Sequence, residues 1–124
     1  NNLFRWDVGG LKANGAVWVL IGMSLYPSAA KWAEKNNQCL TNMNDLVGLY
    51  GSEIMITEIG MPWTDSAACH LFIKDILSKT KLLPNNKGLG VFYWEPQGYN
   101  GWKGYTLGAF NNSGRPTGAL DAFR

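Results

Sequence analysis

Residues 54–64 read IMITEIGMPWT, and the fold prediction starts from this stretch. Its apolar first half predicts a short buried strand, which ends on the carboxylate of Glu58 before the chain turns through Gly60 and Pro62. A carboxylate at the end of an apolar strand, in front of a loop, lies where barrel enzymes keep catalytic groups. A glutamate in this place also caps a following helix or meets a surface lysine, so catalytic and structural interpretations both remain open.

The length and composition fit one globular domain spanning residues 1–124. Hydrophobic residues make up 46% of the 124 residues and charged residues 16%, which favours a buried core and argues against disorder. The net charge of +2 is too small to indicate nucleic acid, and no apolar run approaches the roughly 20 residues that span a bilayer. The chain begins with Asn1 and carries no charged-then-apolar leader, so we expect a processed chain or a piece of a longer one.

Aromatic residues and cysteines narrow the possible functions. Six tryptophans and five tyrosines are many for this length. They fit a packed core, and they also fit a sugar-binding cleft, where flat rings cover the apolar faces of pyranoses. Cys39 and Cys69 are compatible with two buried thiols or with one disulfide in an oxidising compartment. Neither lies in a C-x-x-C pattern, which argues against a zinc or redox site, and no cofactor or metal is expected.

Apolar periodicity predicts strands that alternate with helices. Strands are expected at 17–23, 54–58 and 89–94, centred about 36 residues apart. This alternation predicts an α/β fold with a parallel sheet, and the continuous apolar run at 17–23 predicts a strand covered on both faces. Helices are expected at 2–14 with a stop at Gly15, at 28–35, at 37–50 with a stop at Gly51, after N-cap candidates at 64–66 along the stripe Cys69, Phe72, Ile73, Ile76 and Leu77, and near 116–123.

Similar types of residue follow each of the three predicted strands. Aromatic or acidic residues and a proline follow each strand, as in the stretches 26–27, 58–62 and 95–96. Because parallel strands end at the same edge of a sheet, these residues are expected on one rim. That rim is the catalytic face of a (β/α)8 barrel and the ligand edge of an open α/β sheet. Three strands are fewer than the eight of a barrel, which needs roughly 250 residues.

Glu58 and Glu95 are the two carboxylates expected on this rim. Glycoside hydrolysis requires such a pair, because one carboxylate attacks or stabilises the anomeric centre while the other protonates the leaving oxygen. Glu95, however, follows Trp94 directly, and adjacent side chains in a strand face opposite ways. If Trp94 faces a substrate, Glu95 is expected to turn away and to hold loop backbone or an arginine. The single histidine, His70, lies in a helical stripe and is expected on the helix surface.

Three segments in order resemble the C-terminal part of glycoside hydrolase family 53, the endo-β-1,4-galactanases that cut pectic arabinogalactan side chains. They are IGMSLYP at 21–27, TEIGMPWT at 57–64 and GLGVFYWEP at 88–96, and the closing LDAF at 120–123 resembles the end of the family. The resemblance covers essentially the whole chain. It implies a (β/α)8 TIM barrel that works with retention of configuration, to which this chain contributes the sixth, seventh and eighth strands with their helices.

The resemblance also implies roles for single residues. Glu58 matches the nucleophile of the seventh strand, and Trp94 matches the tryptophan that floors the subsite for the sugar being cleaved. Tyr26 and Trp63 fall at positions that line the cleft. The family's acid/base glutamate ends its fourth strand, to which no part of this chain corresponds, so the isolated chain is expected to be nearly or wholly inactive. The expected partners are β-1,4-galactan or arabinogalactan and the missing N-terminal half of the barrel.

Some features depart from the family pattern or leave alternatives open. Leu25 and Met61 stand where many members have tyrosine. Some galactanases bind calcium near the loop after strand eight, but residues 97–108 contain no carboxylate, so no calcium is expected there. A Cys39–Cys69 disulfide is one of two options, and it would suit a secreted or periplasmic enzyme. The alternatives are a glycan-binding domain without chemistry and a retaining β-glycanase specific for mannan or another polymer.

Overall fold

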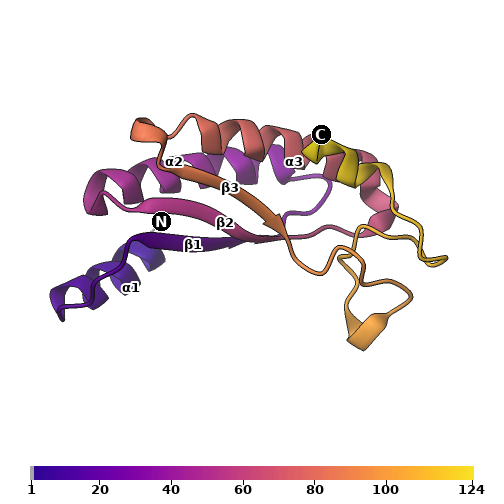
Figure 1. Cartoon of the computed structure of the whole chain (residues 1–124), viewed down its shortest axis with the longest axis horizontal. Coiled ribbons are helices and arrows are strands. Elements are labelled where there is room, and N and C mark those ends of the chain that lie inside the picture. Colours follow the sequence, from indigo (N-terminus) through magenta and orange to yellow (C-terminus); the bar gives the residue numbers. More distant parts are fainter. Residues whose placement is uncertain (1) are drawn as a thin grey trace.

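The computed structural model describes residues 2–124 as a three-stranded parallel sheet with two long helices on one face (Figure 1). The strands are β1 (Leu20–Leu25), β2 (Glu53–Ile59) and β3 (Gly88–Tyr93), and they lie in the order β1-β2-β3. The predicted α/β class and parallel sheet are therefore confirmed. All three strands end at the same edge, where the loop after β3 also lies.

The helices connect successive strands. They are α1 (Asn2–Ala13) before the sheet, α2 (Trp32–Tyr50) between β1 and β2, and α3 (Ser66–Lys81) between β2 and β3. Short 3-10 helices lie at Trp63–Asp65, Pro84–Asn86, Trp102–Gly104 and Gly118–Phe123, the last of which replaces the helix predicted near 116–123. Gly51 ends α2 as predicted: its φ of 65° suits glycine, and its N–H donates to the Val47 carbonyl at 2.8 Å.

The core lies between the sheet and helices α2 and α3. Fully buried side chains of β2 meet those of the two helices, and the apolar stripe predicted for α3 points inward. The largest fully buried members are Met43, Leu46, Ile54, Ile56, Ile59, Met61, Phe72, Ile73 and Ile76. Cys39 and Cys69 belong to this core as free thiols, so the disulfide that the resemblance allowed is not present. Burial raises the pKa of both thiols to about 11.

The opposite face of the sheet is open, which corrects the prediction for the first strand. In β1, Ile21 and Met23 are buried, whereas the alternating positions Leu20, Gly22 and Ser24 are exposed. The strand also begins later than predicted, at Leu20, and Val17 and Val19 before it are 94% and 77% exposed. A barrel strand packs one face on helices and the other on the barrel interior, and three strands of eight do not enclose an interior.

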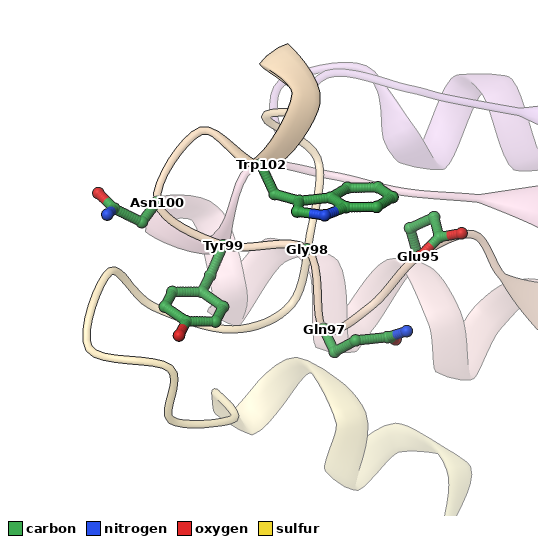
Figure 2. A pocket seen from close by; sticks show the side chains of 6 residues that line it. All are labelled: Glu95, Gln97, Gly98, Tyr99, Asn100 and Trp102. Carbon is green, nitrogen blue, oxygen red and sulfur yellow. The ribbon is translucent and has the colours of Figure 1, made fainter.

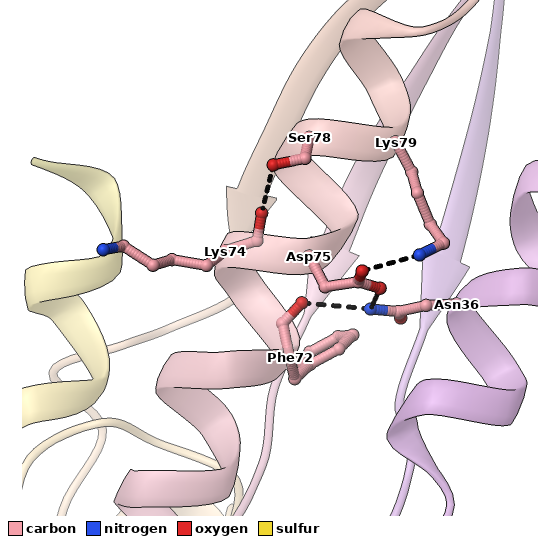
Figure 3. Close-up of polar contacts among 6 residues, drawn as sticks. All are labelled: Asn36, Phe72, Lys74, Asp75, Ser78 and Lys79. Carbon is pink, nitrogen blue, oxygen red and sulfur yellow. Dashed lines mark hydrogen bonds and ion pairs between the residues drawn. The ribbon is translucent and has the colours of Figure 1, made fainter.

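Helix α2 is continuous where the sequence predicted a break near residue 36. Asn36 is fully buried inside it, and its amide donates to the Phe72 carbonyl at 3.1 Å and to Asp75 Oδ2 at 2.8 Å on α3 (Figure 3). Lys79 pairs with the other oxygen of Asp75 at 2.6 Å. Asparagine is a weak helix former, so the sequence favours a break, but these bonds to α3 hold the helical turn in place.

Helix α1 lies at the edge of this arrangement and buries none of its residues completely. It contacts α2 through an ion pair between Arg5 and Asp45 and through Lys12, whose ammonium lies 5.6 Å from the Tyr50 ring centroid. Among residues 2–124, no helix is both long enough and apolar enough to cross a membrane.

Candidate functional site at the strand ends

Glu58 and Tyr26 come together at the carboxyl ends of β1 and β2. The Tyr26 hydroxyl donates a hydrogen bond of 3.0 Å to Oε2 of Glu58. Burial raises the pKa of Tyr26, and the bond to Glu58 raises it further, so the phenol remains a donor at neutral pH. The two residues come from segments 32 positions apart, and the parallel pairing of their strands brings them together.

A β-bulge determines which way Glu58 points. Ile54 and Ile56 are fully buried, so plain alternation would send Glu58 into the same helix-covered face. The register instead skips one residue, because Met23 pairs with Ile56 and the next residue, Ser24, pairs with Glu58. Thr57 is the extra residue, and Glu58 is left only partly buried at the strand end. Such a one-residue shift reverses the facing of every later side chain and is common beside active sites.

Tyr105 is a site residue that the sequence analysis missed. Its hydroxyl donates to the Trp94 carbonyl at 3.0 Å, which ties the loop after β3 to the end of that strand. Its pKa is raised to about 12, first by burial and then by the charges of Glu58 and Glu95, which places it near both carboxylates. The only sequence signal was the aromatic composition of 97–108, which does not single out one ring.

Gly60 leaves the space that these two tyrosines occupy. A Cβ at this position would lie 2.8 Å from the Tyr105 hydroxyl, 3.0 Å from the Leu107 carbonyl oxygen and 3.0 Å from Cε1 of Tyr26. The 2.8 Å contact is shorter than real Cβ atoms make and the two 3.0 Å contacts are tighter than most, so the close approach of Tyr26 and Tyr105 favours glycine here.

The Tyr93 hydroxyl joins the loops after β2 and β3. It accepts from the Met61 N–H at 3.2 Å and lies within donating distance of the carbonyls of Met61 (3.1 Å) and Leu107 (2.9 Å). The Cys69 thiol lies 3.9 Å from the same oxygen. The turn that follows Glu58 is therefore fixed to the third strand through this partly buried phenol.

The structure places the other predicted site residues differently. Trp94 directly follows β3, and its N–H donates to the carbonyl of Ile59 at 2.9 Å, so its backbone lies beside the end of β2. The residue is 47% exposed. Trp63 lines a separate small pocket of about 110 Å³ with Tyr105 and loop residues, and Glu58 is not among the residues that line it. Substrate binding by Tyr26, Trp63 and Trp94 stays a prediction.

A larger pocket lies in the loop that follows β3. It has a volume of about 530 Å³ and is lined by Glu95, Gln97, Gly98, Tyr99, Asn100 and Trp102. Figure 2 shows that the side chains of Glu95, Gln97 and Trp102 extend to the same side of Gly98. This pocket falls in the size range of small-molecule sites, and it combines aromatic rings with a few polar groups as such sites do.

The pocket corrects the expectation for Glu95. Strand alternation does not apply to this residue, because β3 ends at Tyr93 and Glu95 has a φ of 44°, far from extended. Among residues 2–124, none of the three ion pairs joins Glu95 to an arginine. Its carboxylate lines the pocket.

No metal centre is evident in the part of the chain that the structure describes: no three His, Cys, Asp or Glu side chains among residues 2–124 gather as ligands. The His70 Nδ1 lies 3.0 Å from the Gly118 carbonyl on the outer side of α3, in agreement with its predicted surface position.

Comparison with known proteins identifies the family. The family model described as Glycosyl hydrolase family 53 matches residues 1–123. The chain belongs to this family. An arabinogalactan endo-β-1,4-galactanase of Cellvibrio japonicus is 30% identical over 73% of this chain and 29% of its own length. An uncharacterized protein from the bgaB 5′ region of Niallia circulans is 27% identical over 86% of this chain and 34% of its own length.

Solved structures show the same fold. A family 53 catalytic domain of Ignisphaera aggregans superposes with a TM-score of 0.74 at 19% identity, covering 99% of this chain and 43% of that one. A fungal β-1,4-galactanase structure gives a TM-score of 0.73 at 19% identity, covering 98% and 43%. The chain thus spans about a third of the curated relatives and 43% of these structures, and its three strands with their helices form a partial (β/α)8 barrel.

Proposed function

We propose that this family 53 chain belongs to a retaining glycosidase that hydrolyses β-1,4-galactan, with Glu58 as the nucleophile. The observation that carries the proposal is the Glu58 carboxylate at the end of β2, turned out of the core by the bulge and held by the Tyr26 hydroxyl at 3.0 Å. The family match and the galactanase relative from Cellvibrio japonicus support the substrate class.

The chemistry divides between this chain and a group outside it. One oxygen of Glu58 attacks the anomeric carbon while the bond to the leaving sugar breaks, which gives a covalent galactosyl-enzyme. The hydrogen bond from Tyr26 occupies Oε2 and orients the carboxylate for this attack. A glutamate outside residues 1–124 protonates the leaving oxygen and then activates the water that releases the sugar.

The exposed ring of Trp94 would stack under the sugar that is cleaved, with Tyr26 at the side of the cleft. Trp63 lines the neighbouring pocket and would contact a more distant sugar unit of the polysaccharide. We propose that the protein is secreted or exported to the periplasm because its substrate is a polymer. Cys39 and Cys69 are free thiols and do not bear on the location.

Glu58→Ala in the full-length protein tests the role of the nucleophile. Release of reducing ends from galactan is expected to fall by at least about 10³-fold, because the covalent step is lost. Added azide should restore turnover and give a galactosyl azide of inverted configuration. Glu34→Ala, on the exposed side of α2, is the control. Unchanged hydrolysis in Glu58→Ala would remove Glu58 from the mechanism.

The isolated 124-residue chain is expected to be nearly inactive. It lacks the general acid, and such a group is typically worth about 10²–10⁴-fold. Galactan hydrolysis by this chain alone, abolished by Glu58→Gln, would contradict the placement of the acid/base outside it.

One observation keeps a different β-glycan open as the substrate. A xylanase structure from Cellvibrio japonicus matches the fold with a TM-score of 0.66 at 17% identity. The fold therefore does not define the sugar, and turnover on galactan, mannan and xylan has to be compared directly.

A further inference from the structure

We propose that Asn100 is a site of spontaneous chemical modification, at which the Asn100–Gly101 pair converts through a cyclic imide to aspartate and isoaspartate. The inference does not depend on the proposed function. It assigns a self-modifying position to an exposed turn of the loop that follows β3, with water as the only co-reactant.

Two asparagines of the chain are followed by glycine, Asn14 and Asn100. In such a pair the glycine has no Cβ, so its main-chain nitrogen approaches the side-chain amide of the asparagine with little hindrance. Both pairs are exposed, so the access of water does not distinguish them. The difference between the two pairs lies in the hydrogen bonds that each of them makes.

The pair at Asn14 is held closed at the end of α1. The nitrogen that would attack belongs to Gly15, and its N–H donates to the Lys12 carbonyl at 3.0 Å. The amide that would be attacked is the Asn14 side chain, which donates to the Gly10 carbonyl at 2.8 Å. Gly15 also has a φ of 84°, the left-handed conformation that ends helices. Both reacting groups therefore have to break a hydrogen bond before they meet.

The pair at Asn100 has neither of these restraints. Within residues 2–124, no hydrogen bond involves the Asn100 side chain or the Gly101 N–H. Figure 2 shows the Asn100 side chain pointing away from Glu95 and Trp102. Apart from its chain neighbours, no atom lies within 4 Å of the Cβ position of Gly101. The attacking nitrogen and the amide that it attacks are thus both free.

A tight turn explains why the Gly101 N–H has no partner. The Trp102 N–H donates to the Tyr99 carbonyl at 3.1 Å, which leaves Asn100 and Gly101 as the two central residues of the turn. Their φ values of 51° and 72° are those of a type I′ turn. The bond of such a turn joins its outer residues, so the N–H of the second central residue is directed outward.

Ring closure requires the backbone at Asn100 to rotate out of this turn, and the surrounding segment offers little resistance. A single backbone hydrogen bond closes the turn, and residues 99–104 are exposed. Lys103 in the same segment has a φ of 48°, which is unfavourable for a residue with a Cβ. Exposed segments with few buried contacts open locally at a small fraction of the free energy of global unfolding.

The reaction balances with water alone. The Gly101 nitrogen attacks the side-chain carbonyl carbon of Asn100, so that a bond from this nitrogen to Cγ forms while the bond from Cγ to Nδ2 breaks. Ammonia leaves with the proton of the Gly101 N–H. Water then opens the cyclic imide at either carbonyl and gives aspartate or isoaspartate. The new carboxylate adds a negative charge to the segment 97–108, which contains none, and isoaspartate also lengthens the main chain by a methylene.

Incubation of the full-length protein in water enriched in heavy oxygen tests the proposal, because carboxylates formed during the incubation take up the label. Trypsin, used in ordinary water, releases Asn14 in the peptide 13–31 and Asn100 in the peptide 88–103, and each is the only asparagine of its peptide. Fragmentation in the mass spectrometer locates the label. In the folded protein, label should enter Asn100 at least about tenfold faster than Asn14, because two hydrogen bonds have to open at Asn14.

Unfolding and single variants assign the difference to the structure. In concentrated urea both pairs lose their hydrogen bonds, so their labelling rates should agree within about threefold. Asn100→Gln lengthens the side chain and disfavours ring closure, so it should remove most of the label at position 100. Asn14→Gln is the matched control and should leave the rate at Asn100 unchanged.

Equal labelling of the two asparagines in the folded protein would overturn the proposal, as would the absence of label at position 100. A difference that persists in urea would trace the effect to the neighbouring sequence instead of the turn and would overturn it too. The measurement uses neither glycan nor turnover, so its result is independent of the role of Glu58.

Discussion

Gly60→Ala should destabilise the protein by crowding the tyrosines next to Glu58. The new Cβ would lie 2.8 Å from the Tyr105 hydroxyl and 3.0 Å from both the Leu107 carbonyl oxygen and Cε1 of Tyr26. Ordinary contacts begin at 3.4 Å, so these groups must retreat by about half an ångström. One of them is backbone and cannot rotate away.

The expected cost follows from two opposing effects. Overpacking of this kind typically costs about 1–3 kcal/mol. Gly60 does not have a positive φ, so alanine adds no backbone strain and restricts the unfolded chain, which returns about 0.4–1 kcal/mol. We therefore expect the free energy of unfolding to fall by about 1–2 kcal/mol.

Urea denaturation of the wild type and the variant measures this difference, with the m-value as a check that the unfolded states are comparable. Gly48→Ala, on the exposed side of α2, is the matched control. No atom lies within 4 Å of the new Cβ, so the free energy of unfolding should rise by about 0.5–1 kcal/mol. Tyr105→Phe removes the closest clashing atom and should reduce the cost of Gly60→Ala by at least about 0.5 kcal/mol. If Gly60→Ala is as stable as Gly48→Ala, the steric reasoning is wrong.

Two further predictions concern the interior. Asn36→Ala removes two hydrogen bonds from a fully buried amide to α3, so the free energy of unfolding measured in urea should fall by about 1–3 kcal/mol. Asn44→Ala, at an exposed position of the same helix, should lower it by less than about 0.5 kcal/mol. Equal effects of the two substitutions would show that the Asn36 bonds do not stabilise the packing of α2 on α3. In the folded protein, the pKa values of the Cys39 and Cys69 thiols are raised from 9.0 to about 11. Above about pH 9 these thiols ionise more readily in the unfolded chain than in the folded one, so the free energy of unfolding falls as the pH rises from about 9 through about 11. The free energy of unfolding between pH 8 and 11 should fall less in a Cys39→Val, Cys69→Val double variant than in the wild type, and an identical fall in both would contradict this assignment.

The sequence was sufficient to predict the sheet and the element that bears the acid. Continuous apolar runs mark β2 and β3 within one residue of their observed starts, and Glu58 does lie at a strand end. These features depend on local hydrophobicity and on turn residues, both of which are evident from neighbouring residues in the sequence.

The orientation of the acid could not be predicted, because it depends on pairing between strands. Simple alternation from Ile54 and Ile56 sends Glu58 into the core, and only the skipped residue at Thr57 turns it outward. A bulge is a property of the register between two strands and leaves no local mark in either sequence. Glu95 was misjudged for a related reason, since its φ of 44° ends the alternation on which the expectation was based.

The continuity of α2 shows the opposite case, in which a tertiary contact overrides a local preference. The asparagine pair at 36–37 is unfavourable in a helix, and the residues that compensate lie on α3, some 36 to 39 positions later. Secondary structure at this point is decided by packing that the local sequence does not describe.

The sequential order of the strands has a consequence for how the chain acquires its structure. Each strand pairs with the strand just before it in the sequence, as Leu20 with Glu53 and Ile54 with Gly88, so no pairing has to wait for a distant segment. During synthesis, the second strand of each βαβ unit therefore emerges after the strand with which it pairs. The two segments that bring Tyr26 to Glu58 are thus both synthesised before the loop after β3, which adds its contact between Tyr105 and Trp94 last.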